Sequence, residues 1–187
     1  MTTESTALIV IDVQESFRNR DYWSPADFPA FSDRLQTLID GARRRRIPIV
    51  QIFHVEPAGA FSLESGFVKT LAPIAIEPDV IFHKHRHSAL VGTDLSIWLT
   101  ERGIRRLIVS GIRTEQCCET TTRHASDLGF DVDFVSEATL TFPMTARDGR
   151  HYTPAEIRAR TELVLADRFA RIATVDEALG AESLRAA

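Results

Sequence analysis

The chain has 187 residues, of which 44% are hydrophobic and 26% charged, and its formal net charge is −4. This composition is typical of a folded globular protein and excludes an intrinsically disordered one, and the length predicts a single domain at residues 1–187 with its core at about 7–179. The acidic balance argues against nucleic acid or an anionic membrane surface as a partner. No apolar run approaches the ~18 residues of a membrane span, and a basic secretory start is missing, so we expect a cytoplasmic protein.

The two cysteines of the chain, Cys117 and Cys118, are adjacent. Neighbouring Cα atoms lie about 3.8 Å apart, whereas disulfides usually join Cα atoms about 4.4–6.8 Å apart. A disulfide scaffold is therefore excluded, and the free thiols favour a reducing compartment.

Short apolar runs rich in β-branched residues predict strands, and amphipathic stretches between them predict helices. In chain order the elements are a strand at 7–11, a helix at 31–46, strands at 48–53 and 80–82, a helix at 94–102, a strand at 106–110, a helix at 114–128, a strand at 131–135, a helix at 153–169 and a strand at 171–175. This alternation predicts a three-layer α/β/α, Rossmann-like fold with a six-stranded, mostly parallel sheet. The segments 56–79 and 139–151 show no such pattern and predict long loops.

Three chemically active residues are predicted at the carboxyl ends of strands, where open parallel sheets bind their ligands. Asp12 follows the first strand, Lys84 follows the third, and Cys117 lies at the start of the helix after the fourth. With Thr114 as the N-cap, Cys117 is the third helical residue. There the helix dipole and free N–H groups would lower the thiol pKa and stabilise an oxyanion. The structural alternatives are that Asp12 belongs to a turn, that Lys84 is an ordinary solvated lysine and that Cys117 is a packed apolar residue.

Two further clusters carry weaker signals. His83, His85 and His87 alternate, so an extended strand would place them on one face, as in a site for a transition metal. No acidic residue lies among them, so we predict packed or hydrogen-bonded histidines, with no metal and no other cofactor. The basic run at 43–46 is expected to complement the C-terminus of its helix rather than to bind nucleic acid.

Four motifs occur in order along the chain. They are Asp12-Val-Gln14; Lys84 with Ser88-Ala89; Thr93-Asp94-Leu95; and Gly111-Ile-Arg-Thr114-Glu-Gln-Cys117. By these motifs the chain resembles, over almost its whole length, the isochorismatase-like cysteine hydrolase superfamily. Its members include nicotinamidases, N-carbamoylsarcosine amidase, ureidoacrylate amidohydrolase and isochorismatase.

The resemblance implies a catalytic triad of Asp12, Lys84 and Cys117, in which the step from Thr114 selects Cys117 over Cys118. The implied reaction is hydrolysis of a C–N bond, amide or ureido, in a small molecule. Asp12 takes the thiol proton, Lys84 stabilises the charges, Cys117 attacks the carbonyl, and water cleaves the resulting thioester.

The resemblance also implies a cis peptide bond between Ile112 and Arg113 and an oxyanion hole formed by the backbone N–H groups of Arg113 and Cys117. An inward Arg113 side chain would favour a carboxylate-bearing substrate, and an outward one would be a surface residue. The residues expected around the substrate are Phe17, Trp23, His54, Arg86, Arg113 and Phe142.

Two alternatives to the amidohydrolase remain. One is vinyl ether hydrolysis of the isochorismatase type, against which Cys117 argues because such members lack the cysteine. The other is a catalytically silent scaffold of the same fold. His54-Val-Glu56 stands where nicotinamidases carry an Asp-x-His metal motif, which disfavours both a metal and nicotinamide. Relatives form dimers or tetramers, so a homo-oligomer is expected.

Overall fold

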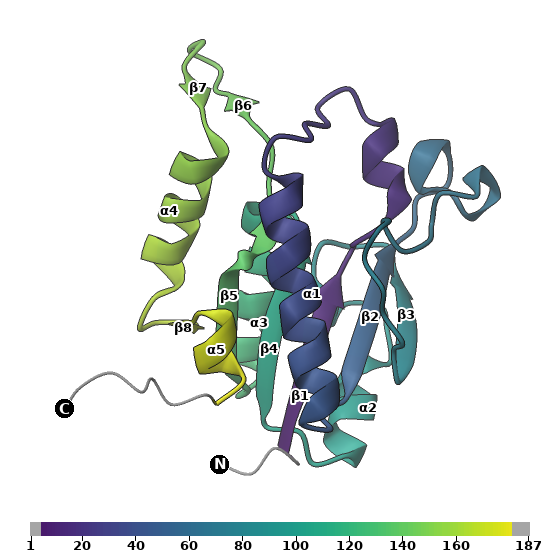
Figure 1. Ribbon diagram of the computed structural model, residues 1–187, viewed down its shortest axis with the longest axis vertical. Coiled ribbons are helices and arrows are strands. Elements are labelled where there is room, and N and C mark those ends of the chain that lie inside the picture. The colour runs from purple at the N-terminus through teal and green to yellow at the C-terminus, as the bar shows by residue number, and fades with distance from the viewer. Residues whose placement is uncertain (1–4, 181–187) are drawn as a thin grey trace.

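A six-stranded sheet runs through the computed structural model, which describes residues 5–180 (Figure 1). The strand order is β3-β2-β1-β4-β5-β8, and every neighbouring pair is parallel. The three-layer α/β/α prediction is confirmed. The strands are β1 (Thr6–Ile11), β2 (Ile49–His54), β3 (Val80–Lys84), β4 (Arg106–Ile112), β5 (Asp131–Leu140) and β8 (Arg171–Ile172).

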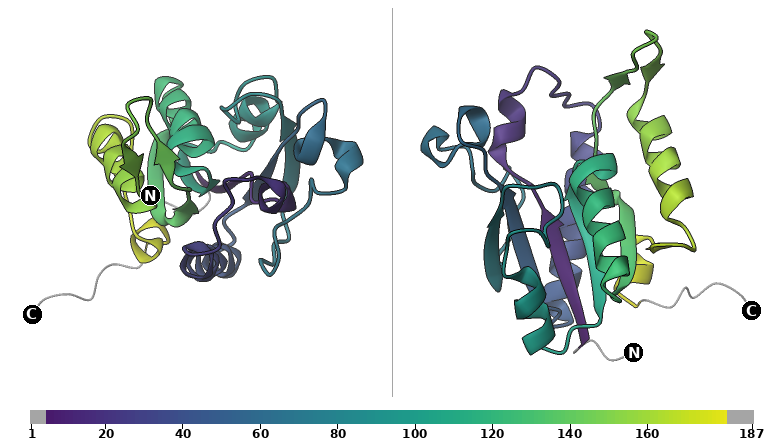
Figure 2. Two further views of the ribbon diagram at one scale, coloured as in Figure 1. Left: turned by 90° about the horizontal axis from the view of Figure 1, so that it is seen from above. Right: turned by 180° about the vertical axis from the view of Figure 1, so that it is seen from behind.

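Helices cover both faces of the sheet. In Figure 1, α1 (Phe28–Arg44) and α5 (Val175–Ala178) lie in front of it, and the view from behind in Figure 2 shows α2 (Leu95–Glu101) and α3 (Glu119–Asp127) on the opposite face. Helix α4 (Pro154–Leu165) follows a small antiparallel pair, β6 (Met144–Thr145) and β7 (His151–Tyr152). Among residues 5–180, no helix is long and apolar enough to cross a membrane.

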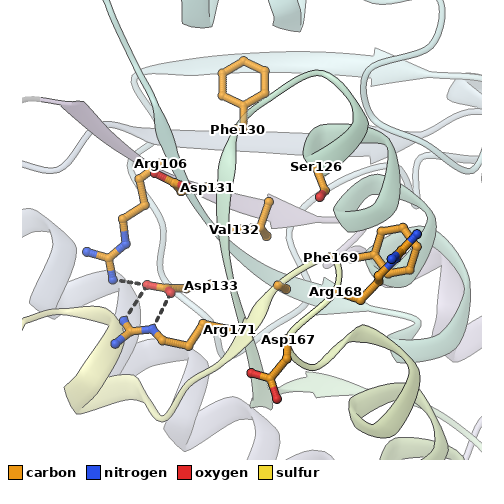
Figure 3. Close-up of a pocket in the computed structure, with 11 residues that line it drawn as sticks. Arg106, Ser126, Phe130, Asp131, Val132, Asp133, Asp167, Arg168, Phe169 and Arg171 are labelled. Carbon is orange, nitrogen blue, oxygen red and sulfur yellow. Dashed lines mark hydrogen bonds and ion pairs between the residues drawn. The ribbon is translucent and has the colours of Figure 1, made fainter.

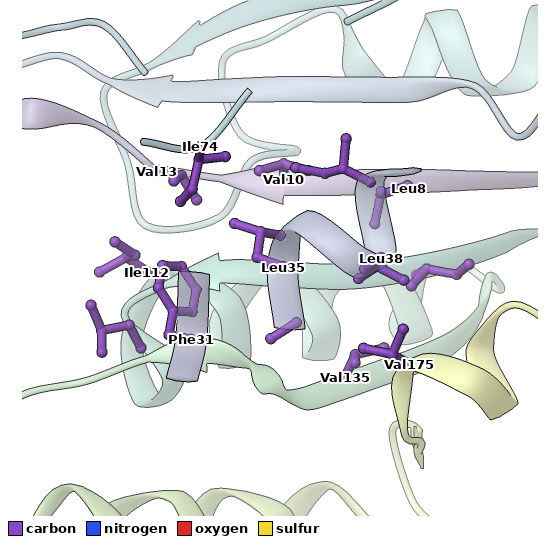
Figure 4. Close-up of a cluster of buried hydrophobic side chains, with 14 of the residues drawn as sticks. Leu8, Val10, Val13, Phe31, Leu35, Leu38, Ile74, Ile112, Val135 and Val175 are labelled. Atoms are coloured by element: carbon purple, nitrogen blue, oxygen red, sulfur yellow. The ribbon is translucent and has the colours of Figure 1, made fainter. Parts of the chain in front are cut away.

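The central strand β1 is buried on both faces, which explains its uninterrupted apolar sequence. Because side chains alternate along a strand, Leu8 and Val10 pack toward α1, whereas Ile9 and Ile11 pack toward the layer that contains α2 and α3. Figure 4 shows the first of these two cores, between the sheet and α1.

Several predicted boundaries are wrong. Strand β5 continues to Leu140, five residues beyond its predicted end, because residues 139–140 pair with the end of β4. The helix predicted at 114–128 is divided into a π-helical turn, η5 (Thr114–Cys118), and α3. Helix α1 begins three residues earlier than predicted, α4 ends at Leu165, and β8 has only two residues.

Other local predictions are confirmed. Helix α4 begins where predicted: Thr153 is its N-cap, in a capping box with Glu156, and Pro154 is the first helical residue. The basic run lies at the C-terminus of α1, where Arg43 pairs with Asp79. The segment 56–79 is a long loop whose only helical parts are the short 3₁₀ turns η3 (Gly59–Phe61) and η4 (Leu63–Ser65); a third such turn, η2 (Glu15–Asn19), follows β1.

Candidate active site

Asp12, Lys84 and Cys117 meet at the carboxyl edge of the sheet. The Lys84 ammonium lies 2.7 Å from Asp12 Oδ2 and donates a hydrogen bond to Cys117 Sγ over 3.3 Å. The three residues are 1%, 0% and 8% exposed, respectively. The structure therefore brings together the three residues that the sequence places after β1, at the end of β3 and after β4.

A close approach of two central strands places Asp12. Gly111 in β4 has a φ of +123°, and a Cβ at this position would lie 2.0 Å from the carbonyl oxygen of Ile11 in β1. Position 111 therefore requires a glycine, because it lies against Ile11, the residue before Asp12. Asp12 itself turns out of the strand with a φ of +52°.

The glutamine of the first motif joins the ends of β1 and β2. The side-chain carbonyl of Gln14 accepts a hydrogen bond from the backbone N–H of His54 over 2.8 Å. Its amide nitrogen donates to the carbonyl of His54 over 3.1 Å and to Ser16 over 2.8 Å. These two hydrogen bonds to the backbone of His54 hold that residue beside the triad.

The segment after Lys84 is anchored to α3. Ser88 Oγ lies 2.9 Å from His124 Nδ1, and the backbone N–H of Ala89 donates to Thr121 Oγ1 over 3.0 Å. The Ser-Ala motif and the polar side chains of α3 therefore hold the loop that follows Lys84.

The turn that carries Cys117 differs from the predicted helix start. Arg113, not Thr114, is the N-cap, and the Thr114 hydroxyl donates to Thr139 Oγ1 over 2.8 Å. The carbonyl of Arg113 accepts hydrogen bonds from the N–H groups of Gln116 and Cys118, the residues on either side of Cys117. The peptide bond between residues 112 and 113 is cis, as the resemblance implied. Cys118 is fully buried in the core.

The prediction of a lowered thiol pKa at Cys117 is wrong. Burial, and next the negative charge of Asp12, raise the pKa of Cys117, and these effects outweigh the lowering by Lys84. Burial lowers the pKa of Lys84, but the charges of Asp12 and Cys117 outweigh it, so the net shift is upward. The arrangement is therefore a buried ion pair beside a protonated thiol.

His54 contacts the same lysine. Its Nδ1 lies 3.2 Å from Lys84 Nζ, and burial, followed by the charge of Lys84, lowers the pKa of His54 to about 4. A neutral ring can accept a hydrogen bond from the ammonium at Nδ1. Lys84 thus faces Asp12, Cys117 and His54, one group for each of its three N–H bonds.

Four of the residues expected around the substrate pack together in an aromatic cluster. Phe142 lies 6.0 Å from Phe17 and 5.5 Å from Trp23, measured between ring centroids, and the Arg113 guanidinium lies 5.6 Å from the Phe142 ring. Tyr22, which sequence reasoning missed, joins this cluster 5.3 Å from Phe142.

Arg113 points inward but has a partner within the chain. It is 9% exposed, and its Nε lies 3.1 Å from the Glu115 carboxylate, which also accepts a 2.6 Å hydrogen bond from Thr141. The expected attraction of an inward Arg113 for a substrate carboxylate is therefore met by Glu115. Sequence reasoning missed Glu115, although it stands two residues away in the same motif.

The other expected substrate residues, His54 and Arg86, line a cavity of about 590 Å³. His85 and His87 line it as well. Two of its lining residues contact the triad: His87 Nδ1 lies 3.8 Å from Cys117 Sγ, and His54 Nδ1 lies 3.2 Å from Lys84 Nζ.

The three alternating histidines do not share a face, because β3 ends at Lys84. His83 stacks on Phe53, with ring centroids 6.0 Å apart, whereas His85 donates from Nδ1 to the carbonyl of Val55 over 2.9 Å and His87 turns toward Cys117. In the described part of the chain, no group of three His, Cys, Asp or Glu side chains is placed to hold a metal ion.

A second cavity, of about 620 Å³, lies at the amino ends of β4 and β5 and beside β8, away from the triad (Figure 3). Asp133 lines it and is paired with Arg106 and with both the Nε and Nη2 of Arg171 at 2.8 and 2.9 Å. The two arginines neutralise this carboxylate, so the cluster is a structural ion-pair network.

Comparisons with known proteins identify the family of the chain. The family model described as "Isochorismatase domain" matches residues 6–174. Nicotinamidase 3 of Arabidopsis thaliana is 32% identical over 152 residues, covering 73% of each chain. The isochorismatase family protein YrdC of Bacillus subtilis (strain 168) is 29% identical over 177 residues, covering 93% of this chain and 94% of YrdC. A solved isochorismatase-family structure from Chromobacterium violaceum ATCC 12472 has a TM-score of 0.87 at 26% identity and covers 97% of this chain and 95% of its own. The chain therefore belongs to the isochorismatase family of hydrolases.

Proposed function

We propose that the protein hydrolyses a C–N bond, amide or ureido, of a small molecule through a thioester on Cys117. The observation that carries this proposal is the buried Lys84 ammonium, which contacts both the Asp12 carboxylate and the Cys117 thiol. A base, a cation and a nucleophile within contact distance are the parts that covalent acyl transfer requires. The similarity to a protein named nicotinamidase supports an amide as the substrate class.

In the first half of the proposed reaction, Asp12 takes the thiol proton while Sγ attacks the substrate carbonyl. The raised pKa of Cys117 means that the thiol is protonated before attack, so proton transfer and bond formation proceed together. Because nucleophilicity increases with thiol pKa, the sulfur formed in this way is a strong nucleophile. Lys84 stays charged and balances the negative charge as it moves from Asp12 to the sulfur.

The tetrahedral oxygen would be held by the backbone N–H groups of Arg113 and Cys117. One feature supports this placement: the Arg113 carbonyl receives hydrogen bonds from the N–H groups of Gln116 and Cys118, the residues on either side of Cys117. Each such donor supplies about 3 kcal/mol to the transition state in acyl-transfer enzymes. The departing amine then receives a proton from Asp12.

Vinyl ether hydrolysis and a silent scaffold are the alternatives. The contact between Lys84 and Cys117 favours a working nucleophile over both, since neither alternative uses one. A single-domain organisation, a small-molecule partner, a homo-oligomeric assembly and a cytoplasmic location remain predictions.

The test is an ammonia-release screen over small carboxamides and ureido acids, with two adjacent cysteine variants as a matched pair. Cys117→Ala should lower turnover on the order of 10⁴-fold or more, whereas Cys118→Ala should retain activity. Mass spectrometry should find the acyl adduct on Cys117. Equal loss of activity in two variants with normal circular dichroism would contradict the choice of nucleophile. Absence of turnover together with an unreactive Cys117 would favour the scaffold.

A further inference from the structure

An arginine and a glutamate form a buried ion pair in the turn that carries Cys117. Nε of Arg113 lies 3.1 Å from Oε1 of Glu115, and the two side chains are 11% and 9% exposed. Both atoms are out of contact with solvent, and neither has a hydrogen-bond partner in the described part of the chain. The other carboxylate oxygen, Oε2, accepts a hydrogen bond from the Thr141 hydroxyl, which holds Glu115 in place. Glu115 therefore neutralises the charge of Arg113.

The sequence and the turn geometry place this ion pair beside the proposed reaction. Glu115 stands two residues before Cys117, and the carbonyl of Arg113 accepts a hydrogen bond from the N–H of Cys118. The N–H of Arg113 is also the proposed donor to the tetrahedral oxygen, so its guanidinium lies within one side-chain length of that oxygen. A change in the charge of either side chain therefore acts on the group that the sulfur attacks.

The pair leaves no net positive charge for a carboxylate on the substrate. The Arg113 guanidinium faces Glu115 and an aromatic ring, that of Tyr22, whose centroid lies 5.0 Å from Cζ. The other buried cation, Lys84, is paired with Asp12. A substrate carboxylate near Arg113 would lie close to the Glu115 carboxylate, and like charges brought together in a buried site are strongly unfavourable. A substrate without a carboxylate meets no such repulsion.

We propose that Glu115 is a specificity-determining residue, which cancels the charge of Arg113 and restricts the protein to substrates without a carboxylate beside the scissile bond. This inference rests on the proposed attack by Cys117. It names the substrate class as uncharged carboxamides and ureas, rather than ureido acids or half-amides of dicarboxylic acids. Glu115 acts through the charge of Arg113 and takes no part in making or breaking bonds.

The experiment compares two reagents of nearly equal size on the Cys117 thiol: iodoacetamide, which is neutral, and iodoacetate, which carries a carboxylate. Cys118→Ala serves as the background, so that Cys117 is the only thiol in the chain. Mass spectrometry gives the rate for each reagent. The ratio of the two rates reports the charge near the sulfur, because thiol reactivity and access affect both reagents alike. The unaltered site should favour iodoacetamide more strongly than N-acetylcysteine does in the same buffer, and the opposite preference would overturn the uncharged substrate class.

Three variants of the pair change its charge in different directions. Glu115→Gln keeps an acceptor for Thr141 but leaves Arg113 without its counter-charge. The ratio should shift toward iodoacetate about 10- to 100-fold, which corresponds to one hydrogen bond to a charged group. Arg113→Gln leaves the carboxylate unpaired and should shift the ratio in the opposite direction. Glu115→Asp keeps the charge and should stay close to the original ratio.

Glu119→Gln is the matched control. Glu119 stands two residues after Cys117, as Glu115 stands two before it, and is also buried and paired, with Arg123 of α3 and Arg160 of α4. Because these partners lie on helices outside the catalytic turn, the ratio should stay at its original value. An unchanged ratio in Glu115→Gln, or an equal shift in Glu119→Gln, would overturn the role of Glu115 and leave the proposed nucleophile standing. A Cys117 that reacts with neither reagent would overturn both proposals.

Discussion

Replacement of Lys84 by methionine tests how the buried ion pair contributes to stability. Lys84 and Asp12 are 0% and 1% exposed, and their charged atoms lie 2.7 Å apart. Lys84→Met keeps a long side chain in the same space but leaves the Asp12 carboxylate without its counter-charge. Removal of one member of a buried ion pair costs about 3–5 kcal/mol, so we expect the free energy of unfolding to fall by that amount.

The double variant Asp12→Asn, Lys84→Met separates the charge effect from packing. Both charges are then absent, and replacing a whole buried pair with neutral groups is often neutral or stabilising by about 1–4 kcal/mol. We therefore expect the double variant to be more stable than Lys84→Met alone, although both should be inactive.

Urea denaturation followed by circular dichroism measures both variants, with equal m-values as the check that the comparison is valid. The loss of stability at alkaline pH gives an independent measurement of the contribution of Lys84. Because the pKa of Lys84 is raised in the folded state, its stabilising contribution is complete below the ordinary lysine value of about 10.4 and is lost as pH rises through the higher folded value. The reasoning would be refuted by a Lys84→Met protein within about 1 kcal/mol of the original, or by a double variant no more stable than the single one.

Three further predictions concern Gly111, His54 and Thr153. Gly111→Ala places a Cβ 2.0 Å from the Ile11 carbonyl, so kcat/KM should fall about 100-fold through displacement of the adjacent site, whereas a near-normal value would show that the two strands can separate without cost. Because the folded pKa of His54 is about 4 and the unfolded value about 6.5, its contribution to stability should decline as pH falls from about 6.5 toward 4; thermal melts of His54→Gln should show a shallower decline, and identical slopes would exclude this cause. Thr153→Ala removes the capping box of α4 and should cost about 1 kcal/mol in urea denaturation; an unchanged midpoint would mean that tertiary packing alone holds that helix end.

The sheet could be predicted from the sequence because its strands are buried on both faces. A run such as residues 7–11 has no polar position to confuse the pattern. The end of β5 lacked that advantage, since Ser136 and Thr139 interrupt the apolar run. The pairing of residues 139–140 with the end of β4 is a tertiary feature that periodicity does not show.

The triad was predictable because a parallel sheet gathers the carboxyl ends of its strands, so three separate positions shared one expected edge. The raised pKa of Cys117 was not predictable. The start of one helix shows only the nearby backbone, whereas burial and the charge of Asp12 depend on the surrounding fold. The ion pair of Glu115 and the contact of His87 with the Cys117 sulfur were not predicted for a similar reason. Both depend on which neighbour the side chain faces, and nothing in the surrounding sequence specifies it.

The central pairing of β1 with β4 also constrains when the protein can first become active during folding. The hydrogen bond from Ser110 to the carbonyl of Ile9 joins positions 101 residues apart, and the reactive groups follow these same two strands and β3. Contacts of such separation form slowly, because a long loop must close before they contribute. Enzymatic activity during refolding should thus return with the last slow phase of sheet assembly, after helical circular dichroism has largely recovered.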